Sequence, residues 1–135
     1  MLHPFHARGI DWENDTIKVA LLDSNYVPDE DSQIFWDDVS SNEISGTGYT
    51  AGGATLASKT RSYDSGNDMT TFGCADPEWT AATFSDAKWA VFYKSTGTAN
   101  TSPLIRTVQI TGDNSVVSGT YTLTIGSGVF RIRNS

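Results

Sequence analysis

The residues that most often build catalytic and covalent sites are scarce in this sequence. Cys74 is the single cysteine among 135 residues, which excludes an internal disulfide and a zinc site with paired thiolates. The two histidines, His3 and His6, both lie near the start of the chain, in a segment that is usually ordered only when it docks. Because a general base must stay within hydrogen-bond reach of its nucleophile, we expect no Ser-His-Asp or Cys-His site and no enzyme activity.

Long apolar runs and basic clusters are also missing. No apolar run approaches the roughly 20 residues that a membrane-spanning helix needs, and residues 1–8 lack the uninterrupted apolar core of a secretory signal. Acidic residues outnumber basic ones 16 to 9, and a net charge of −7 disfavours direct binding to nucleic acid. We interpret the small basic end, Arg131 and Arg133, as a solvated tail in preference to a contact with nucleic acid or an acidic partner. The sequence therefore predicts neither a nucleic-acid partner nor a membrane partner.

What the sequence does have is period-two alternation of apolar and β-branched residues, broken by turn residues at short intervals. This pattern is typical of half-buried antiparallel strands. We predict strands over residues 16–22, 87–94, 104–110 and 120–125. The chain is therefore predicted to be mostly β, with a single antiparallel β-sandwich or barrel-like domain over residues 13–135, an N-terminal arm over residues 1–12 and at most one short helix.

The composition of individual segments predicts how some of them are placed. Residues 87–94 carry apolar side chains on both faces, so we expect this strand to be covered on both sides at the centre of the fold. Residues 111–115 have the composition of a hairpin connection, so we expect the strands 104–110 and 120–125 to pair with each other. Residues 29–39 favour a single helical turn and an irregular loop about equally.

Two segments have some of the features of ligand sites. The densest group of carboxylates has neither the spacing nor the glycine of a twelve-residue calcium loop, so we interpret it as a solvated acidic loop. It consists of Asp29, Glu30, Asp31, Asp37 and Asp38. The glycine-rich segment 46–53 is followed by Lys59 but has no glycine directly before that lysine, as a P-loop requires, so we interpret it as a surface connection. We expect no metal, no cofactor and no catalytic residue.

Four tryptophans are many for a chain of this length, and aromatic side chains contribute to both cores and interfaces. We assign Trp79 and Trp89 to the core. Trp12 and Trp36 stand beside acidic residues, in an arm and a loop, where a large ring is harder to bury within its own subunit. Interface anchoring, stacking on a sugar and ordinary packing all stay open for these two. The candidate interface residues are Leu2, Phe5, Ile10, Trp12, Phe35 and Trp36, and we hypothesise that residues 1–12 dock on a neighbouring subunit.

Several longer segments form a pattern of their own. Residues 43–56 read EISGTGYTAGGATL, and residues 15–22 and 26–29 precede them. Residues 79–80, 90–99 and 101–105 follow in the same order. Together these segments resemble a family of small virion structural proteins of tailed bacteriophages, and the resemblance covers residues 10–128. Residues 62–75 and 131–133 fit the family pattern poorly.

The resemblance implies a virion structural protein, and in the first place a capsid decoration or cement protein that binds and stabilises neighbouring major capsid subunits. The expected partners are the major capsid protein and other virion proteins, with a homo-oligomer on the particle. The expected location is the virion, after synthesis in the bacterial host cytoplasm. The alternatives are a tail, collar or baseplate component, which would contact host glycan through Trp12, Trp36 or Tyr49, and, more remotely, a small enzyme on a β scaffold.

Overall fold

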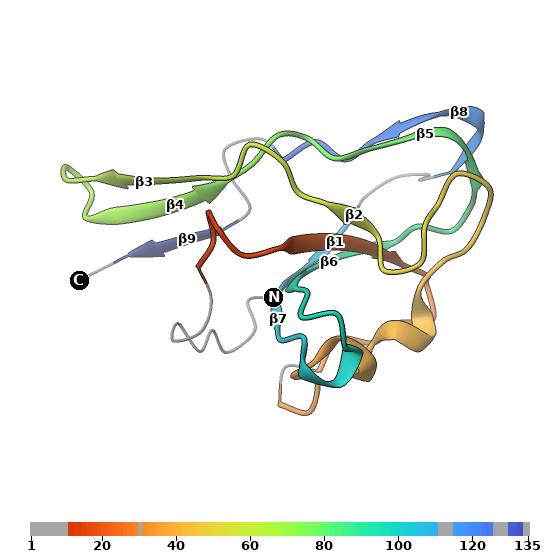
Figure 1. The fold of residues 1–135 in the computed structure, drawn as a ribbon, viewed down its shortest axis with the longest axis horizontal. Coiled ribbons are helices and arrows are strands. Elements are labelled where there is room, and N and C mark those ends of the chain that lie inside the picture. The colour runs from red at the N-terminus through yellow and green to blue at the C-terminus, as the bar shows by residue number, and fades with distance from the viewer. Residues whose placement is uncertain (1–10, 30, 111–114, 126–129, 134–135) are drawn as a thin grey trace.

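The computed structural model describes residues 11–29, 31–110, 115–125 and 130–133, the last of these by their backbone alone. Among the residues that the structure describes, strands account for 44% and helical turns for 8%, so the prediction of a mostly β fold is confirmed. Within the described ranges the strands form three antiparallel sheets of four, three and two strands, arranged as a β-sandwich-like domain (Figure 1).

A four-stranded sheet forms the centre of the molecule. In its middle lie β1 (Ile17–Leu22) and β6 (Trp89–Lys94), flanked by β2 (Ala54–Thr55) and β7 (Leu104–Gln109). β1 and β6 pair antiparallel along their whole length, from Ile17 opposite Lys94 to Leu22 opposite Trp89. The strands predicted over residues 16–22, 87–94 and 104–110 are therefore confirmed, apart from one or two residues at their ends.

Both faces of this sheet are buried. Side chains alternate between the faces along a strand, so the consecutive apolar residues of β1 and β6 contribute to two separate clusters. The larger cluster takes Ile17, Val19, Leu21, Ala90 and Phe92, and the smaller one takes Ala20, Leu22, Val91 and Tyr93. The prediction that residues 87–94 form a central strand covered on both sides is thus confirmed.

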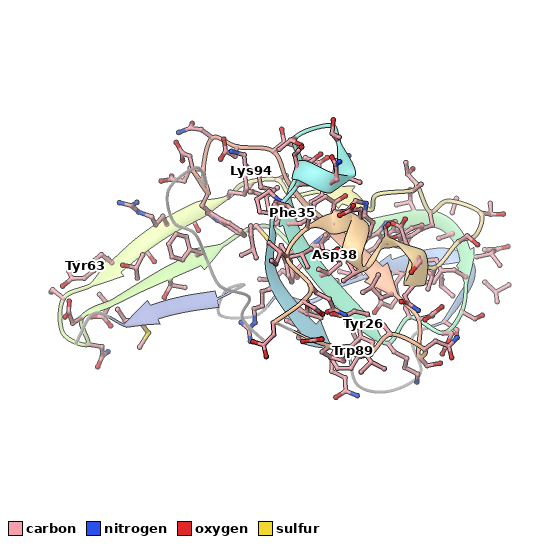
Figure 2. The ribbon with its side chains drawn as sticks, turned by 90° about the horizontal axis from the view of Figure 1, so that it is seen from below. Tyr26, Phe35, Asp38, Tyr63, Trp89 and Lys94 are labelled. Atoms are coloured by element: carbon pink, nitrogen blue, oxygen red, sulfur yellow. The ribbon has the colours of Figure 1, made fainter. Side chains whose placement is uncertain are left out.

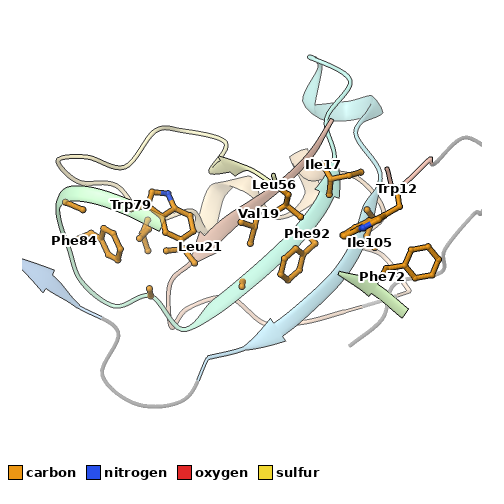
Figure 3. Packing of buried hydrophobic residues seen from close by; sticks show 14 residues of the cluster. Trp12, Ile17, Val19, Leu21, Leu56, Phe72, Trp79, Phe84, Phe92 and Ile105 are labelled. Atoms are coloured by element: carbon orange, nitrogen blue, oxygen red, sulfur yellow. The ribbon is translucent and has the colours of Figure 1, made fainter. Parts of the chain in front are cut away.

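Different segments cover the two faces. β5 (Glu78–Phe84) and β8 (Val116–Thr122) pair with each other, and the buried Trp79 and Phe84 of β5 belong to the larger cluster. Figure 3 shows these two rings at one end of that cluster and Trp12 and Phe72 at the other. The smaller cluster is covered by Tyr26, Trp36 and Val39, which come from the segment between β1 and β2. The core therefore has two parts, one on each side of the central sheet.

The third sheet extends away from the sandwich (Figure 1). It consists of β3 (Thr60–Asp64), β4 (Met69–Gly73) and β9 (Phe130–Arg133), with β4 in the middle. Because Phe130–Arg133 pair with β4, the interpretation of the basic end as a solvated tail is wrong for its backbone. When a strand pairs in a sheet, its backbone N–H and C=O groups form hydrogen bonds, and the stabilisation from these bonds does not depend on the charge of the side chains.

The predicted pairing of residues 104–110 with 120–125 is also wrong. β7 pairs with β6, and β8 pairs with β5 and begins at Val116. Residues 111–114 of the intervening segment lie outside the described ranges. The turn composition of this segment predicts that the chain changes direction, but it does not specify which strand each flanking strand pairs with. The partner is decided by packing, since Tyr121 of β8 lies against Trp79 and Phe84 of β5.

Residues 29–39 contain one short helical turn. Trp36–Asp38 form a 3₁₀ turn, and a second 3₁₀ turn, Ser40–Asn42, follows directly. Pro28 does not begin a helix, and Asp31 to Phe35 are not helical. The open choice between a helical turn and an irregular loop is settled in favour of a loop that carries a single turn.

Candidate protein-binding surface

The segment from Tyr26 to Asp38, called here the acidic loop, is held on the central sheet by two aromatic contacts. The ring of Trp36 stacks on Tyr93 of β6, with 4.6 Å between centroids and an interplanar angle of 4°. The ring of Tyr26 meets Trp89 edge to face, with 5.5 Å between centroids, and the two lie side by side in Figure 2. The loop is thus fixed at both of its ends by rings that belong to the same strand.

Backbone hydrogen bonds join the acidic loop to the beginning of β7. The Trp36 amide donates to the Ser102 carbonyl at 2.8 Å, and the Leu104 amide donates to the Ile34 carbonyl at 2.9 Å. Between these bonds, Phe35 forms an isolated β-bridge with Pro103. Residues 34–36 of the acidic loop are therefore joined by sheet-like backbone contacts to residues 102–104 at the start of β7.

The side chain of Gln33 organises the interior of the acidic loop. Its Oε1 accepts from the Tyr26 hydroxyl at 2.6 Å and from the Asp29 amide at 3.0 Å, while its Nε2 donates to the Val27 carbonyl at 2.9 Å. Asp38 works in the same way at the other end, because its Oδ2 accepts from the amides of Ile34 and Phe35, both at 2.9 Å. These hydrogen bonds tie the backbone of Val27, Asp29, Ile34 and Phe35 to side chains of the same loop.

Three large apolar side chains project from this fixed backbone. Val27 is 73% exposed, Ile34 is 44% exposed and Phe35 is 36% exposed. These three residues, called here the apolar loop surface, keep their backbone linked through Gln33 and Asp38. A surface whose backbone is already ordered loses less conformational entropy when it binds, so this part of the molecule is suited to contact another protein.

The charge around the apolar loop surface is negative. Asp29, Asp31, Asp37 and Asp38 are exposed within the same loop. A hydrogen bond from the Ser32 hydroxyl, 2.6 Å from Asp29 Oδ2, holds the pKa of Asp29 below its ordinary value, so this carboxylate is ionised at neutral pH. Within the ranges that the structure describes, no three His, Cys, Asp or Glu side chains are grouped as metal ligands. The loop therefore exposes both apolar and acidic side chains, which fits a partner that presents apolar and basic side chains.

The structure separates the candidate interface residues from the sequence into three groups. Phe35 lies in the apolar loop surface. Trp12 and Trp36 are buried at 3% and 8% exposure, so the expectation that their rings are hard to bury within the same subunit is wrong. Each ring contacts residues of its own chain: Trp12 Nε1 donates to the Gly73 carbonyl at 3.0 Å, and the ring of Trp36 stacks on Tyr93. Leu2, Phe5 and Ile10 lie outside the described residues, as do His3 and His6.

Val27 and Ile34 were missed by the sequence reasoning, although a signal was present for Ile34. Ile34, Phe35 and Trp36 are consecutive, and a loop backbone turns each successive side chain in a different direction. Because the side chain of Trp36 is buried in the smaller cluster, Ile34 and Phe35 could not both be buried beside it. Val27 carried no comparable signal, because single apolar residues are common on protein surfaces.

A second polar cluster holds the glycine-rich segment 46–53 on the central sheet. Glu43 Oε2 accepts from the Tyr49 hydroxyl at 2.7 Å and from the Gly52 amide at 2.8 Å, and the Tyr49 hydroxyl accepts from the Leu21 amide at 2.9 Å. The Tyr93 hydroxyl donates to the Gly52 carbonyl at 2.5 Å. Burial raises the pKa of Glu43, and burial also raises the pKa of Tyr49 and of Tyr93. Each of these groups is used within the fold, so the cluster fastens a loop, as expected for a surface connection.

No helix in the described part of the chain combines the length and the apolar content that a membrane crossing requires. Comparison of the sequence and fold with protein-family models, curated proteins and solved structures gives no match. The resemblance to small virion proteins of tailed phages therefore stays a prediction from the sequence.

Proposed function

We propose that this chain is a structural protein of a bacteriophage virion, and that it is a capsid decoration protein that binds neighbouring major capsid subunits. The proposal is supported by the resemblance of residues 10–128 to small tailed-phage virion proteins and, above all, by the apolar loop surface. Val27, Ile34 and Phe35 are large apolar side chains on a backbone that is ordered before any partner binds. A protein that adds contacts across a seam between subunits needs such a surface.

The apolar loop surface is too small to be the whole contact. A standard protein interface removes about 1,600 Å² from water in total, which takes about 20 to 30 residues on each side. Three side chains supply a centre for such an interface, where most of the binding energy is usually found. The hypothesis that residues 1–12 dock on a neighbouring subunit now applies to residues 1–10, since Trp12 is part of the core.

The acidic residues of the loop predict the charge of the partner's surface. The carboxylates of the acidic loop should lie opposite lysine or arginine side chains of the capsid subunit. Binding should then weaken as the salt concentration rises, because exposed charges are screened beyond a Debye length of about 10 Å at 0.1 M salt.

The proposal can be tested with a matched pair of substitutions. Val27→Asp, alone and combined with Ile34→Asp, places a charge in the apolar loop surface, whereas Val117→Asp changes an equally exposed valine, 79% exposed, on β8. Capsids lacking this chain are incubated with each variant, and the occupancy of the particle is measured over a range of concentrations. We expect the loop variants to bind roughly tenfold or more weakly, as for loss of an interface hot spot, and Val117→Asp to bind like the wild type.

Two results would contradict the proposal. Equal occupancy for the loop variants and the wild type would remove the apolar loop surface from the contact. A density map of the intact particle that shows the chain in a ring at the tail, and not repeated over the shell, would replace the decoration role by a tail, collar or baseplate role.

A further inference from the structure

In the described part of the fold, β3 is the longest edge strand that pairs with its neighbour in an unbroken register. The sheet order β3-β4-β9 leaves one side of β3 without a strand partner among the described residues. Every residue of Thr60–Asp64 is exposed. The strand pairs with β4 in an unbroken register, from Thr60 opposite Gly73 to Asp64 opposite Met69.

The other described edges are interrupted or shorter, and β9, which pairs with β4 without a register shift, is four residues long. β2 is two residues long. The pairing of β7 with β6 shifts register between Phe92 and Tyr93, and the pairing of β5 with β8 shifts twice. Proteins commonly use short strands, bulges, prolines and lysines to prevent an edge from pairing with another chain. Within Thr60–Asp64, β3 has no bulge, proline or lysine, its charged residues are one Arg61 and one Asp64, and no strand of the described residues pairs with its outer edge.

The sequence of β3 is complementary to itself. In an antiparallel pair centred on Ser62, each Arg61 stands opposite the partner's Tyr63, and each Thr60 stands opposite the partner's Asp64. No charged residue of the strand then faces a residue of like charge, and the guanidinium of Arg61 can stack on an aromatic ring. We propose that β3 pairs antiparallel with β3 of a second copy of this chain, joining two three-stranded sheets into one sheet of six strands.

The position and charge of this sheet favour the same contact. The hairpin of β3 and β4, Thr60–Gly73, contains one basic residue, Arg61, and two acidic ones, Asp64 and Asp68, so its net charge is only −1 in a chain of net charge −7. It extends away from the sandwich, and Tyr63 lies far from Phe35 and Asp38 of the acidic loop (Figure 2). Two copies can therefore meet through their hairpins while their acidic bodies stay apart, where salt screens the repulsion.

The expected contact is weak and depends on concentration. A pair of five-residue strands buries much less than the roughly 1,600 Å² of a standard interface, so a permanent dimer is not expected. Sedimentation velocity of the purified chain should show a weight-average mass that rises from 14.6 kDa toward twice that value as the protein concentration is raised. A mass that stays at 14.6 kDa up to about 1 mM protein would overturn the proposal.

Introduction of a like charge tests the register. Tyr63→Lys places a lysine opposite the partner's Arg61 in both halves of the pair, and we expect the dimer dissociation constant to rise about tenfold. Adding Arg61→Glu to this variant places a glutamate opposite the partner's lysine at position 63, so the facing charges become opposite and the dimer should be restored. Because Arg61 and Tyr63 are both exposed, Tyr63 to 59%, the thermal unfolding of the monomer should change little in either variant. A dimer that persists unchanged in Tyr63→Lys would show that the copies use another surface.

A cysteine at the centre of the pair gives a second, independent readout. In a background with Cys74→Ser, Ser62→Cys should form an intermolecular disulfide on mild oxidation, since directly opposite residues of an antiparallel pair have Cα atoms about 4.5–5.5 Å apart. Ser65→Cys, an exposed serine in the adjoining turn, is the control, because the pairing keeps its two copies far apart. Equal rates of crosslinking for the two variants would overturn the proposal. These tests use the purified chain alone, so their outcome is independent of the proposed role on a capsid.

Discussion

Replacement of Trp12 tests most directly where this residue belongs. Trp12 is 3% exposed, its Nε1 donates to the Gly73 carbonyl at 3.0 Å, and its ring forms an edge-to-face pair with Phe72 with 6.0 Å between centroids. If Trp12 is part of the core, Trp12→Ala should strongly destabilise the isolated chain. If Trp12 instead anchors an arm on another subunit, the same substitution should leave the isolated chain almost unchanged.

The size of the effect can be worked out in two ways. Burial of an aromatic side chain removes about 200 Å² from water, which at about 25 cal/mol per Å² amounts to about 5 kcal/mol. Measured Trp or Phe to Ala substitutions in protein cores lower the free energy of unfolding by about 3–5 kcal/mol. Trp12→Phe keeps most of the apolar volume but removes the donor to Gly73, and it should lower the free energy of unfolding by about 1–3 kcal/mol.

Urea unfolding followed by circular dichroism measures both variants. With an m value of about 2 kcal/mol/M, a loss of about 4 kcal/mol moves the midpoint by about 2 M. Should Trp12→Ala already be unfolded without urea, Trp12→Phe still gives a measurable shift. Val27→Ala is the control, because Val27 is 73% exposed and its substitution should stay within about 0.5 kcal/mol. A loss below about 1 kcal/mol for Trp12→Ala would refute the core assignment.

Two further substitutions test the glycine-rich segment and the carboxylate that holds it. A Cβ at Gly53, whose φ is +87°, would lie 2.0 Å from the Val19 carbonyl oxygen, so Gly53→Ala should lower the free energy of unfolding by about 2–6 kcal/mol. Gly97 has a similar φ of +91° but a Cβ there would have no atom within 4 Å, so Gly97→Ala should lower the free energy of unfolding by about 1–2 kcal/mol. Equal losses for the two variants in thermal or urea unfolding would contradict the role of close packing at Gly53. Burial raises the pKa of Glu43, so the fold prefers its protonated form, and this stabilisation is present below the ordinary pKa of 4.5 and is lost as the pH rises through the raised value. Relative to Glu43→Gln, the wild type should therefore become less stable as the pH is raised from about 4 to 7, and a difference in unfolding free energy that is independent of pH would refute this account.

The sequence alone determined where the chain forms its central strands. β1, β6 and β7 follow from the alternation of apolar and β-branched residues, and the double burial of β6 follows from apolar residues on both of its faces. These features depend on neighbours along the chain, which a sequence displays directly. The glycine-rich connection 46–53 was predicted for the same reason, since its turn-forming residues are adjacent in the sequence.

The strands of the projecting sheet were not predicted, because they lack this local pattern. Thr60–Asp64 is exposed along its whole length, so it has no buried face and no alternation to recognise. β9 carries arginines at alternate positions and resembles a solvated tail. Both strands exist because each pairs with β4, and β-strand pairing depends on backbone groups that are the same in every sequence.

The candidate surface was predicted in part, at Phe35, and the reason for the remainder is physical. Burial of Trp12 depends on Gly73, which is 61 positions away along the chain, and burial of Trp36 depends on Tyr93. A contact between such distant residues is decided when the whole chain packs, and no local pattern records it. The acidic loop shows the same division: its composition was visible in the sequence, but only the hydrogen bonds of Gln33 and Asp38 decided which of its apolar side chains face outward.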